Sequence, residues 1–416
     1  MQKFTFPYYF FEYFCGCKST VCTKSNYKKT IKRMKILHLS DLHLGKRVNG
    51  FPMLEDQKFI LDQILRHIDD MQPQAVIIAG DVYDKSVPAA EAVELLDEFL
   101  CELAKRKLQV FVVSGNHDSV ERLAFASRLI ENSGVHIARV YDGHVKPIVL
   151  QDENGPVNIY MMPFVKPVVV KELFPDENIS TYTDALSVAV KQMDINEKER
   201  NLLVAHQFVT GTKGVAGVHR SDSEDLSVGG LDNVDASAFA QFDYVALGHI
   251  HGPQNIDGYD HIRYCGSPLK YSFSEAKHHK SLTVVEFGQK GDLNITSIPL
   301  TPKHDMREIR GTYEQLTDAR NYTGTATDDY LHVTLTDEQD VVDALAKLRT
   351  IYPNIMILDY DNNRTRNIKV VTGTADMTKS PIDIISEFFK THNGDTDMAD
   401  EQRKYIQTLI DKIWED

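Results

Sequence analysis

The sequence has few cysteines, and their positions exclude a disulfide framework. Its 416 residues include five of them, an odd number that lies mostly within the first 22 residues: Cys15, Cys17, Cys22, Cys101 and Cys265. No paired spacing runs through the body of the chain, so the fold does not depend on disulfide bonds. The simplest interpretation is a protein of the reducing cytoplasm.

Long apolar runs are also missing. No stretch approaches the ~20 apolar residues that a transmembrane helix needs. Near the N-terminus, Glu12 interrupts the aromatic stretch FTFPYYFFEYF, and the positive charge follows that stretch, so the pattern is not that of a signal peptide. We expect residues 1–33 to be an unstructured extension or a mis-assigned start, with Met34 as the natural start. A membrane-surface anchor is the alternative.

Positive charge is scarce as well. Lys and Arg number 46 against 60 Asp and Glu, and the formal net charge is −14. Phosphate contacts usually need Lys and Arg, and the sequence has no basic stripe of the kind that a stand-alone nucleic-acid binder carries. Net charge says little about one groove, however, and bound divalent cations can supply the positive charge at a site. A nucleic-acid substrate would therefore require cations or a partner subunit.

The composition that remains is that of a globular protein of two or three domains, with 42% hydrophobic and 25% charged residues. In the first two thirds, short apolar runs alternate with stretches that have apolar residues at three- and four-residue spacing. The runs 35–39, 75–79 and 109–113 predict buried strands, and 55–71 and 88–107 predict helices. This alternation indicates βαβ units and a largely parallel inner sheet.

Later apolar runs predict a second sheet stacked on the first, with strands at 158–162, 202–205, 244–247, 262–265 and 282–286. The expected fold is a four-layer α/β/β/α sandwich over residues 34–300. After residue 300 the pattern changes to a small α+β capping domain, 301–376, with strands at 330–335 and 355–360 around a helix at 338–349. Two amphipathic helices are expected in the last segment, 377–416.

Five segments place a possible metal ligand at the C-terminal end of a predicted strand. They are Asp41-Leu42-His43, Gly80-Asp81, Gly115-Asn116-His117-Asp118, His206 and Gly248-His249-Ile250-His251. Ligand sites in α/β sheets lie at the carboxyl ends of strands, so these segments can converge. Each is weak alone, because a lone Asp-x-His is usually a loop and a lone histidine usually belongs to the core. Their order and common placement make coincidence very unusual.

The residue types indicate the metal chemistry. Asp, Asn and His combine oxygen and imidazole ligands without a thiolate, which favours Mn²⁺, Fe or Zn²⁺ over Ca²⁺ or a structural zinc site. Seven ligands suffice for two ions with open positions for water and substrate. Two ions can stabilise the attacking and leaving oxygens of a phosphoryl displacement. We expect two divalent cations, with Mn²⁺ as the favoured metal.

This order of motifs resembles that of the calcineurin-like metallophosphoesterase superfamily over residues 34–300. Within it the chain resembles the SbcD family of bacterial nuclease subunits and its archaeal and eukaryotic relatives in double-strand-break repair. The segments HLSDLHLG, GNHDS and YCGSPLKYSFSE (264–275) carry this closer resemblance.

The resemblance implies a role for each residue. Asp41, His43 and His251 are expected to bind the first ion and Asp81 to bridge both. Asn116, His206 and His249 are expected to complete the second. His117 would contact the scissile phosphate and protonate the leaving oxygen, and Asp118 would orient His117 through its other ring nitrogen.

One position departs from part of the family. Archaeal and eukaryotic relatives have a histidine three residues after the bridging aspartate, where this chain has Asp84, as bacterial members tolerate. Asp84 is a candidate substrate-binding residue or a turn cap, and Tyr83 a candidate DNA contact or a packing residue. Arg220 lies in the loop 211–230, which either guides substrate or is merely mobile.

The resemblance further implies DNA hydrolysis, as a 3′-to-5′ exonuclease and as an endonuclease at hairpins or blocked ends. It implies a homodimer within a heterotetramer whose partner is an SbcC-type ATPase, docked on the C-terminal helices. Two alternatives remain. One is an enzyme for a small phosphodiester or phosphomonoester, which Asp84-Lys85-Ser86 in place of the phosphatase Asp-Arg-Gly and the added segment 301–416 disfavour. The other is a catalytically inactive scaffold, which the full ligand set disfavours.

Overall fold

The computed structural model describes residues 33–224, 232–366, 380–392 and 396–414. The predicted extension 1–33 lies outside this part of the chain apart from Arg33. All the described residues belong to one compact unit.

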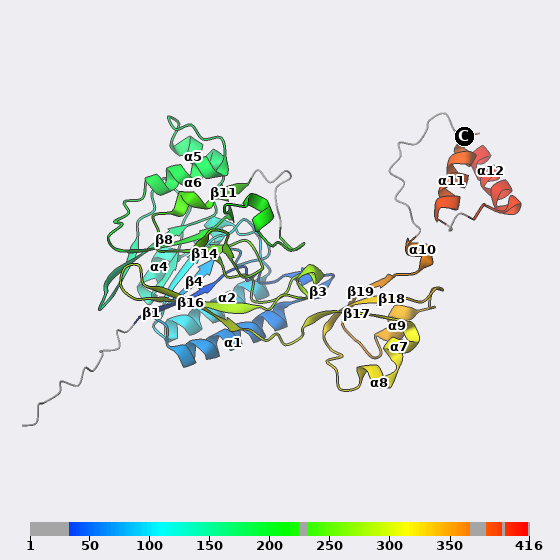
Figure 1. The fold of residues 1–416 in the computed structure, drawn as a ribbon, viewed down its shortest axis with the longest axis horizontal. Helices are drawn as coiled ribbons and strands as arrows, with labels where there is room; N and C mark the ends of the chain where they lie inside the picture. The colour runs from blue at the N-terminus through cyan, green and yellow to red at the C-terminus, as the bar shows by residue number, and fades with distance from the viewer. Residues whose placement is uncertain (1–32, 225–231, 367–379, 393–395, 415–416) are drawn as a thin grey trace, which may run out of the picture. The chain divides into compact units, whose positions relative to one another are not determined.

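Two six-stranded sheets form the larger part of the fold (Figure 1). The first has the order β16-β15-β1-β4-β5-β6, and β1, β4, β5 and β6 run parallel. Its strands are β1 (Met34–Leu39), β4 (Ala75–Ala79), β5 (Gln109–Val113), β6 (Val135–Ile137), β15 (Ser281–Phe287) and β16 (Leu293–Pro299). The parallel centre that the βαβ pattern predicts is confirmed, and antiparallel β15 and β16 extend it at one edge.

The second sheet has the order β13-β14-β12-β9-β8-β7 with four parallel central strands. Its strands are β7 (Ile148–Asp152), β8 (Gly155–Met162), β9 (Arg200–His206), β12 (Tyr244–Gly248), β13 (Gln254–Ile256) and β14 (Tyr259–Tyr264). The predicted strand 282–286 is β15, which belongs to the first sheet instead. It pairs along β1 over five residues, from Met34 opposite Phe287 to His38 opposite Thr283, and this pairing fixes its place.

Side chains between the sheets form an apolar layer, because alternate residues of each strand point to opposite faces. Ile77 and Phe111 of the first sheet pack with Leu202 and Val204 of the second, all fully buried. Helices cover the outer faces (Figure 1): α1 (Leu54–Met71) and α2 (Ala90–Lys105) on the first sheet, α5 (Pro167–Leu173) and α6 (Tyr182–Lys191) on the second. The α/β/β/α sandwich predicted from the sequence is confirmed.

Shorter elements connect these layers. They are β2 (Arg47–Val48), β3 (Phe51–Pro52), α3 (Val120–Leu123), α4 (Ser127–Ile130), β10 (Phe208–Thr210) and β11 (Asn233–Asp235), with 3₁₀ turns at Glu131–Ser133, Gly214–Gly217, Ala236–Phe239 and Phe273–Glu275.

A three-stranded parallel sheet follows residue 300. It consists of β17 (Met306–Gly311), β18 (Tyr330–Leu335) and β19 (Ile355–Tyr360), with α7 (Tyr313–Thr317), α8 (Ala319–Tyr322), α9 (Ala344–Leu348) and α10 (Asn363–Arg366). Its first strand, β17, was not predicted. Tyr330 joins this sheet to α1, because its hydroxyl donates to the buried Asp56 carboxylate over 2.8 Å.

The helix predicted at 338–349 is wrong in length, since α9 begins at Ala344. Asp343 has a φ of 55°, a left-handed conformation that a right-handed helix cannot pass through. Two acidic side chains before it accept backbone N–H bonds from other segments: Asp337 accepts from Tyr313 over 2.8 Å, and Glu338 accepts from Asn363 over 3.3 Å. The two C-terminal helices are present as α11 (Pro381–His392) and α12 (Asp400–Trp414).

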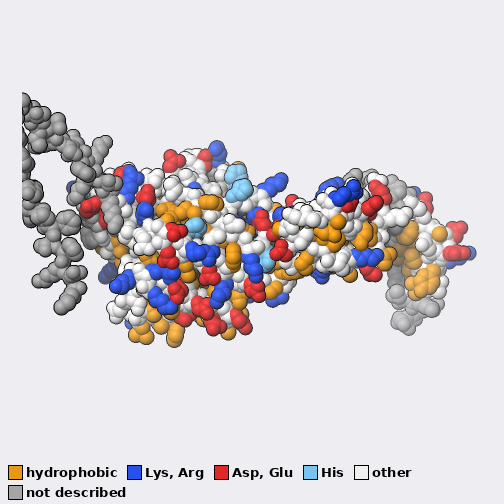
Figure 2. All heavy atoms as spheres, turned by 90° about the horizontal axis from the view of Figure 1, so that it is seen from below, with side chains coloured by type: hydrophobic (Ala, Val, Ile, Leu, Met, Phe, Trp, Pro, Cys, Tyr) orange, Lys and Arg blue, Asp and Glu red, His pale blue; other side chains and the backbone are white. Residues whose placement is uncertain are grey.

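The distribution of charged side chains and the hydropathy of the helices in the described residues match two predictions from the sequence. Figure 2 shows Lys and Arg interspersed with Asp and Glu over the face in view, without a continuous basic stripe there. None of the helices in the described part of the chain has the length and apolar character to cross a membrane.

Candidate metal centre

The predicted ligands come together in the loops that follow five central strands. Parallel strands end at a common edge, so β1, β4 and β5 deliver Asp41, Asp81 and Asn116 from the first sheet. Strands β9 and β12 deliver His206 and His249 from the second.

The backbone at these positions is strained. Among the described residues, nine non-glycine residues have positive φ, and four of them are predicted ligands: Asp41 (52°), His43 (44°), Asp81 (46°) and His249 (104°). Such conformations cost of order 1–3 kcal/mol each and persist where the surrounding structure imposes them. Because these four residues lie at one sheet edge, we infer that the surrounding structure holds the site in backbone conformations that the residues themselves disfavour.

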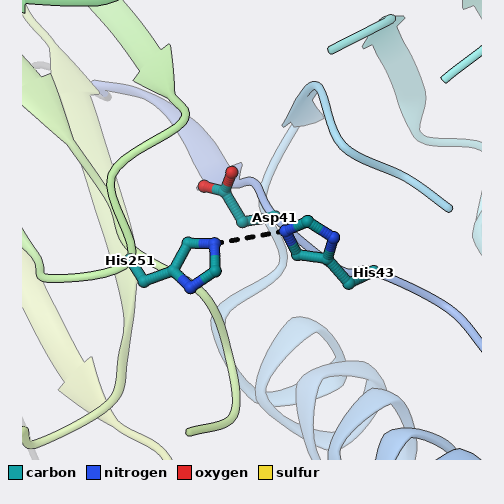
Figure 3. Close-up of side chains that lie close together, drawn as sticks. All are labelled: Asp41, His43 and His251. Atoms are coloured by element: carbon teal, nitrogen blue, oxygen red, sulfur yellow. Dashed lines mark hydrogen bonds between the residues drawn. The ribbon is translucent and has the colours of Figure 1, made fainter. Parts of the chain in front are cut away.

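The first group of ligands is Asp41, His43 and His251 (Figure 3). The ring Nε2 atoms of His43 and His251 lie 3.1 Å apart, and one ligand atom from each of the three residues lies within 4.8 Å of the others. All three residues are at most 1% exposed. The set is therefore a buried cluster of oxygen and nitrogen donors, as predicted for the first ion.

The second group is centred on the amide oxygen of Asn116. This oxygen lies 3.1 Å from His206 Nε2 and 3.0 Å from His249 Nδ1. The other ring nitrogen of His206 lies 2.9 Å from the carbonyl oxygen of Ala79, which can only accept, so Nδ1 carries the hydrogen. In the neutral ring, Nε2 consequently presents a lone pair to the oxygen atoms around it, and a cation fits there.

Asp81 lies between the two groups. Its Oδ2 is 3.7 Å from His43 Nε2 and 3.3 Å from His206 Nε2, so one carboxylate oxygen faces both sets. Its Oδ1 accepts the backbone N–H of His117 over 3.0 Å. This is the position that a bridging ligand needs.

The charges of these side chains set their protonation. Burial would raise the pKa of Asp81, but the charge and hydrogen bond of His206 outweigh it and hold this pKa well below its usual range. Burial would lower the pKa of His206, but Asp81 outweighs it and raises this pKa to about 9. Burial lowers the pKa of His249 to about 3 and that of His43 well below its usual value, so both rings are neutral, the form that binds metal.

His117 adjoins the ligands but is oriented differently from the prediction. Its Nδ1 lies 3.0 Å from the backbone carbonyl of Asp84, so Nδ1 donates and Nε2 points into the site, 3.9 Å from Asp81 Oδ2. The Asp118 carboxylate instead accepts backbone N–H bonds from Val82 (3.1 Å), Tyr83 (2.9 Å) and Gly115 (2.9 Å). Asp118 therefore joins the loops after β4 and β5, and the expectation that it orients the His117 ring is corrected.

The three remaining candidate residues differ in their exposure and in their contacts. Asp84 accepts from Lys46 Nζ over 2.7 Å, and this ion pair lies beside His43. Tyr83 is 8% exposed and packs in the core, which favours its packing role over a DNA contact. Arg220 is exposed, with its guanidinium 5.8 Å from the ring centroid of Phe208, and its substrate contact stays a prediction.

Gln57 is a supporting residue that was not predicted from the sequence. Its side-chain amide donates to the carbonyl of His43 over 2.7 Å and lies 3.1 Å from the hydroxyl of Tyr271. Gln57 is 1% exposed and lies on the apolar face of α1 with Ile60 and Ile64. In the sequence, a glutamine on the otherwise apolar face of this predicted helix was the signal that could have identified it.

Two family models match the chain. The model of the calcineurin-like phosphoesterase family matches residues 34–253, and a model described as the Type 5 capsule protein repressor C-terminal domain matches 302–393. The chain is 36% identical over 387 residues to the D subunit of the nuclease SbcCD from Staphylococcus epidermidis, covering 91% of this chain and 97% of that protein.

Solved structures give weaker likenesses. A Thermus thermophilus protein matches with a TM-score of 0.36 and 11% identity, over 64% of this chain and 99% of its own. A dimetal phosphatase from Danio rerio matches with a TM-score of 0.34 and 11% identity, over 65% of this chain and 98% of its own. At these TM-scores neither likeness supports an argument about the site.

The substitution Gly80→Ala tests the second ligand group. A Cβ at Gly80 (φ +88°) would collide with the His206 imidazole, whereas a Cβ at Gly50 (φ +87°) meets nothing within 4 Å. Both changes impose the same left-handed strain, about 1–2 kcal/mol. We expect Gly80→Ala to weaken Mn²⁺ binding at one of two sites at least tenfold, by calorimetric titration, and Gly50→Ala to leave it unchanged. Equal affinities in the two variants would contradict this placement of His206.

The pKa of His206, raised to about 9, predicts proton release on metal binding. Below that pH the ring holds a proton that a cation at Nε2 must displace, so affinity rises by up to about tenfold per pH unit and levels off above pH 9. Calorimetry at pH 7 in two buffers of different ionisation enthalpy should detect the release of about one proton for each ion that binds at the group of Asn116, His206 and His249. Binding without proton release would show that His206 is already neutral.

Proposed function

Because the chain belongs to the calcineurin-like phosphoesterase family, in its branch of SbcD-type nuclease subunits, we propose that it is a metal-dependent DNA nuclease. It hydrolyses DNA phosphodiesters as a 3′-to-5′ exonuclease and as an endonuclease at hairpins and blocked ends. It acts in DNA repair, recombination and replication in the cytoplasm.

One observation supports this function above the others. Asp81 lies between two groups of buried oxygen and nitrogen donors, and His117 lies beside that carboxylate. Asp41, His43, Asp81 and His251 would hold one cation, and Asp81, Asn116, His206 and His249 the other. Two bound cations supply Lewis-acid stabilisation of the attacking and leaving oxygens. Mn²⁺ suits the mixed ligands because they include no thiolate.

His117 supplies the proton in this mechanism. Its Nδ1–H donates to the Asp84 carbonyl, which fixes the ring so that Nε2 faces the site. A protonated Nε2 can donate to the oxygen that leaves as the phosphodiester bond breaks. Asp118 positions this step indirectly, through the three backbone N–H groups that connect the loops around His117 and Asp81.

The C-terminal helices support a partner of the SbcC ATPase type. Exposed apolar side chains lie on α11 and α12: Ile384 (37%), Ile385 (36%), Phe388 (59%), Tyr405 (67%) and Leu409 (41%). The ion pair between Arg403 and Asp383, 2.9 Å long, joins the two helices. An apolar helix surface of this kind suits docking against another helix or a groove, and such a partner would supply the grip on DNA that the acidic chain lacks.

Two further exposed apolar residues support the homodimer. Phe125 is 81% exposed and Leu129 is 78% exposed, and both lie within a dozen residues of His117, around α3 and α4. Phe125 and Leu129 are four residues apart in the chain, and this pair of exposed large apolar side chains is our candidate for the contact surface. A two-fold contact there would place two active sites in one assembly, which becomes a heterotetramer with two ATPase subunits.

The substitution His117→Ala tests the activity. With Mn²⁺ and a labelled DNA hairpin, we expect cleavage to fall about 10²- to 10⁴-fold because the proton donor is lost. His261→Ala is the control, since His261 lies on β14, opposite the amino end of β12, and should retain activity. Turnover of only a small chromogenic phosphodiester would favour the small-ester alternative. Silence on both substrates, even with an SbcC-type ATPase and ATP, would favour the scaffold.

The substitution Phe125→Glu tests the dimer. A charge in the centre of the contact should shift the isolated chain from dimer to monomer in sedimentation velocity, because a buried charge without a partner is costly. Val342→Glu changes a side chain of similar exposure, 74%, in the third sheet's domain and should leave the dimer intact. Dimers of undiminished stability in Phe125→Glu would place the contact elsewhere.

A further inference from the structure

The segment 264–275, which carried the closer family resemblance, contacts the first ligand group through Glu275 and His251. It leaves β14 at Tyr264 and ends in the 3₁₀ turn Phe273–Glu275. Glu275 is fully buried and Lys280 is 5% exposed, and their side chains form an ion pair of 2.5 Å. Neither residue belongs to the two ligand groups, so this buried pair has no part in the mechanism above.

The pair is in contact with His251 through the ring nitrogen that faces away from His43. His251 Nδ1 lies 2.7 Å from the hydroxyl of Ser223 and 3.4 Å from Glu275 Oε1. The Ser223 hydroxyl also donates to Glu275 Oε1. The ring is thus held on the side opposite its Nε2, which faces His43.

The backbone of His251 is held by side chains as well. Lys280 Nζ donates to the His251 carbonyl over 2.9 Å and to Ser267 Oγ over 2.8 Å. Glu224 accepts the His251 backbone N–H over 2.8 Å. Side chains therefore occupy the N–H, the carbonyl and Nδ1 of this one residue, and Nε2 is the group directed at His43.

Stability alone gives no reason for such an arrangement. Removing two charges from water is costly, and apolar residues of similar volume often replace a buried ion pair without loss of stability. His206, by contrast, is oriented by a single backbone carbonyl, that of Ala79. The residues around His251 have the features of a set that fixes a metal ligand, for which orientation and basicity matter.

We propose that Ser223, Glu275 and Lys280 are positioning residues that fix His251 and thereby set the affinity of the first metal site. Glu275 orients the ring through Nδ1, and Lys280 holds both that carboxylate and the His251 carbonyl. Ser223 connects residues 211–224, which include Arg220, to the same ligand, so this segment contributes to the metal site as well as to the surface near it. The inference rests on the proposed two-metal function.

The test is Mn²⁺ titration of the metal-free full-length chain, by calorimetry and by the electron paramagnetic resonance signal of free Mn²⁺. Wild type should bind two ions. In Glu275→Gln, which retains the shape and removes the charge, one binding event should weaken about 10- to 100-fold and the other should stay within about twofold. Ser223→Ala should weaken the same event by a smaller factor, because Glu275 can still reach the ring.

Asp152→Asn is the control, because it removes a carboxylate from another ion pair, in which the arginine is buried and the carboxylate is 16% exposed. Arg200, 2% exposed, donates to Asp152 over 2.5 Å at the start of β9, whereas His206 is at its end. This variant should lower the thermal unfolding midpoint and bind both ions as wild type does.

Glu275→Gln with two wild-type affinities and a lowered midpoint would overturn the inference, since the pair would then be only structural. If Glu275→Gln does not fold, Ser223→Ala decides in the same way. Wild type that binds fewer than two ions would overturn the proposed function and the inference with it.

Discussion

The Asp81 carboxylate is the constraint on which the rest of the site depends. It is buried at 2% exposure, and one of its oxygens faces histidine nitrogens from both ligand groups. A buried carboxylate in that position needs positive charge close by. In the metal-free chain a proton on His206 supplies this charge, and bound cations would replace that proton. Two parallel sheet centres, stacked with their strand ends at one edge, are what bring the two groups to the same oxygen.

Much of this was predictable from the sequence because it depends on strand ends. A buried apolar run fixes where a strand stops, and the polar residue that follows must lie at the carboxyl edge of the sheet. Asp41, Asp81, Asn116, His206 and His249 all follow this rule, and the structure brings them together. The layered fold was predictable for the same reason, since alternation of apolar runs with amphipathic helices leaves few ways to bury both faces of two sheets.

The remainder was not predictable because it depends on contacts that side-chain identity does not reveal. The Asp84 carbonyl orients His117, and a carbonyl is present at every residue. Asp118 bonds three backbone amides from two loops, which requires the loops to be placed first. The helix expected from residue 338 fails at Asp343, which has a left-handed conformation, and the acidic residues Asp337 and Glu338 accept bonds from Tyr313 and Asn363. Glu275 and Lys280 are likewise distant in sequence from the histidine that they hold.

The most direct test of the account is anomalous diffraction from crystals of the full chain grown with Mn²⁺. Two anomalous peaks are predicted, one among Asp41, His43 and His251 and one among Asn116, His206 and His249, with Asp81 in contact with both ions. A single peak, or two peaks of which only one contacts Asp81, would contradict the claim that this carboxylate joins two metal sites.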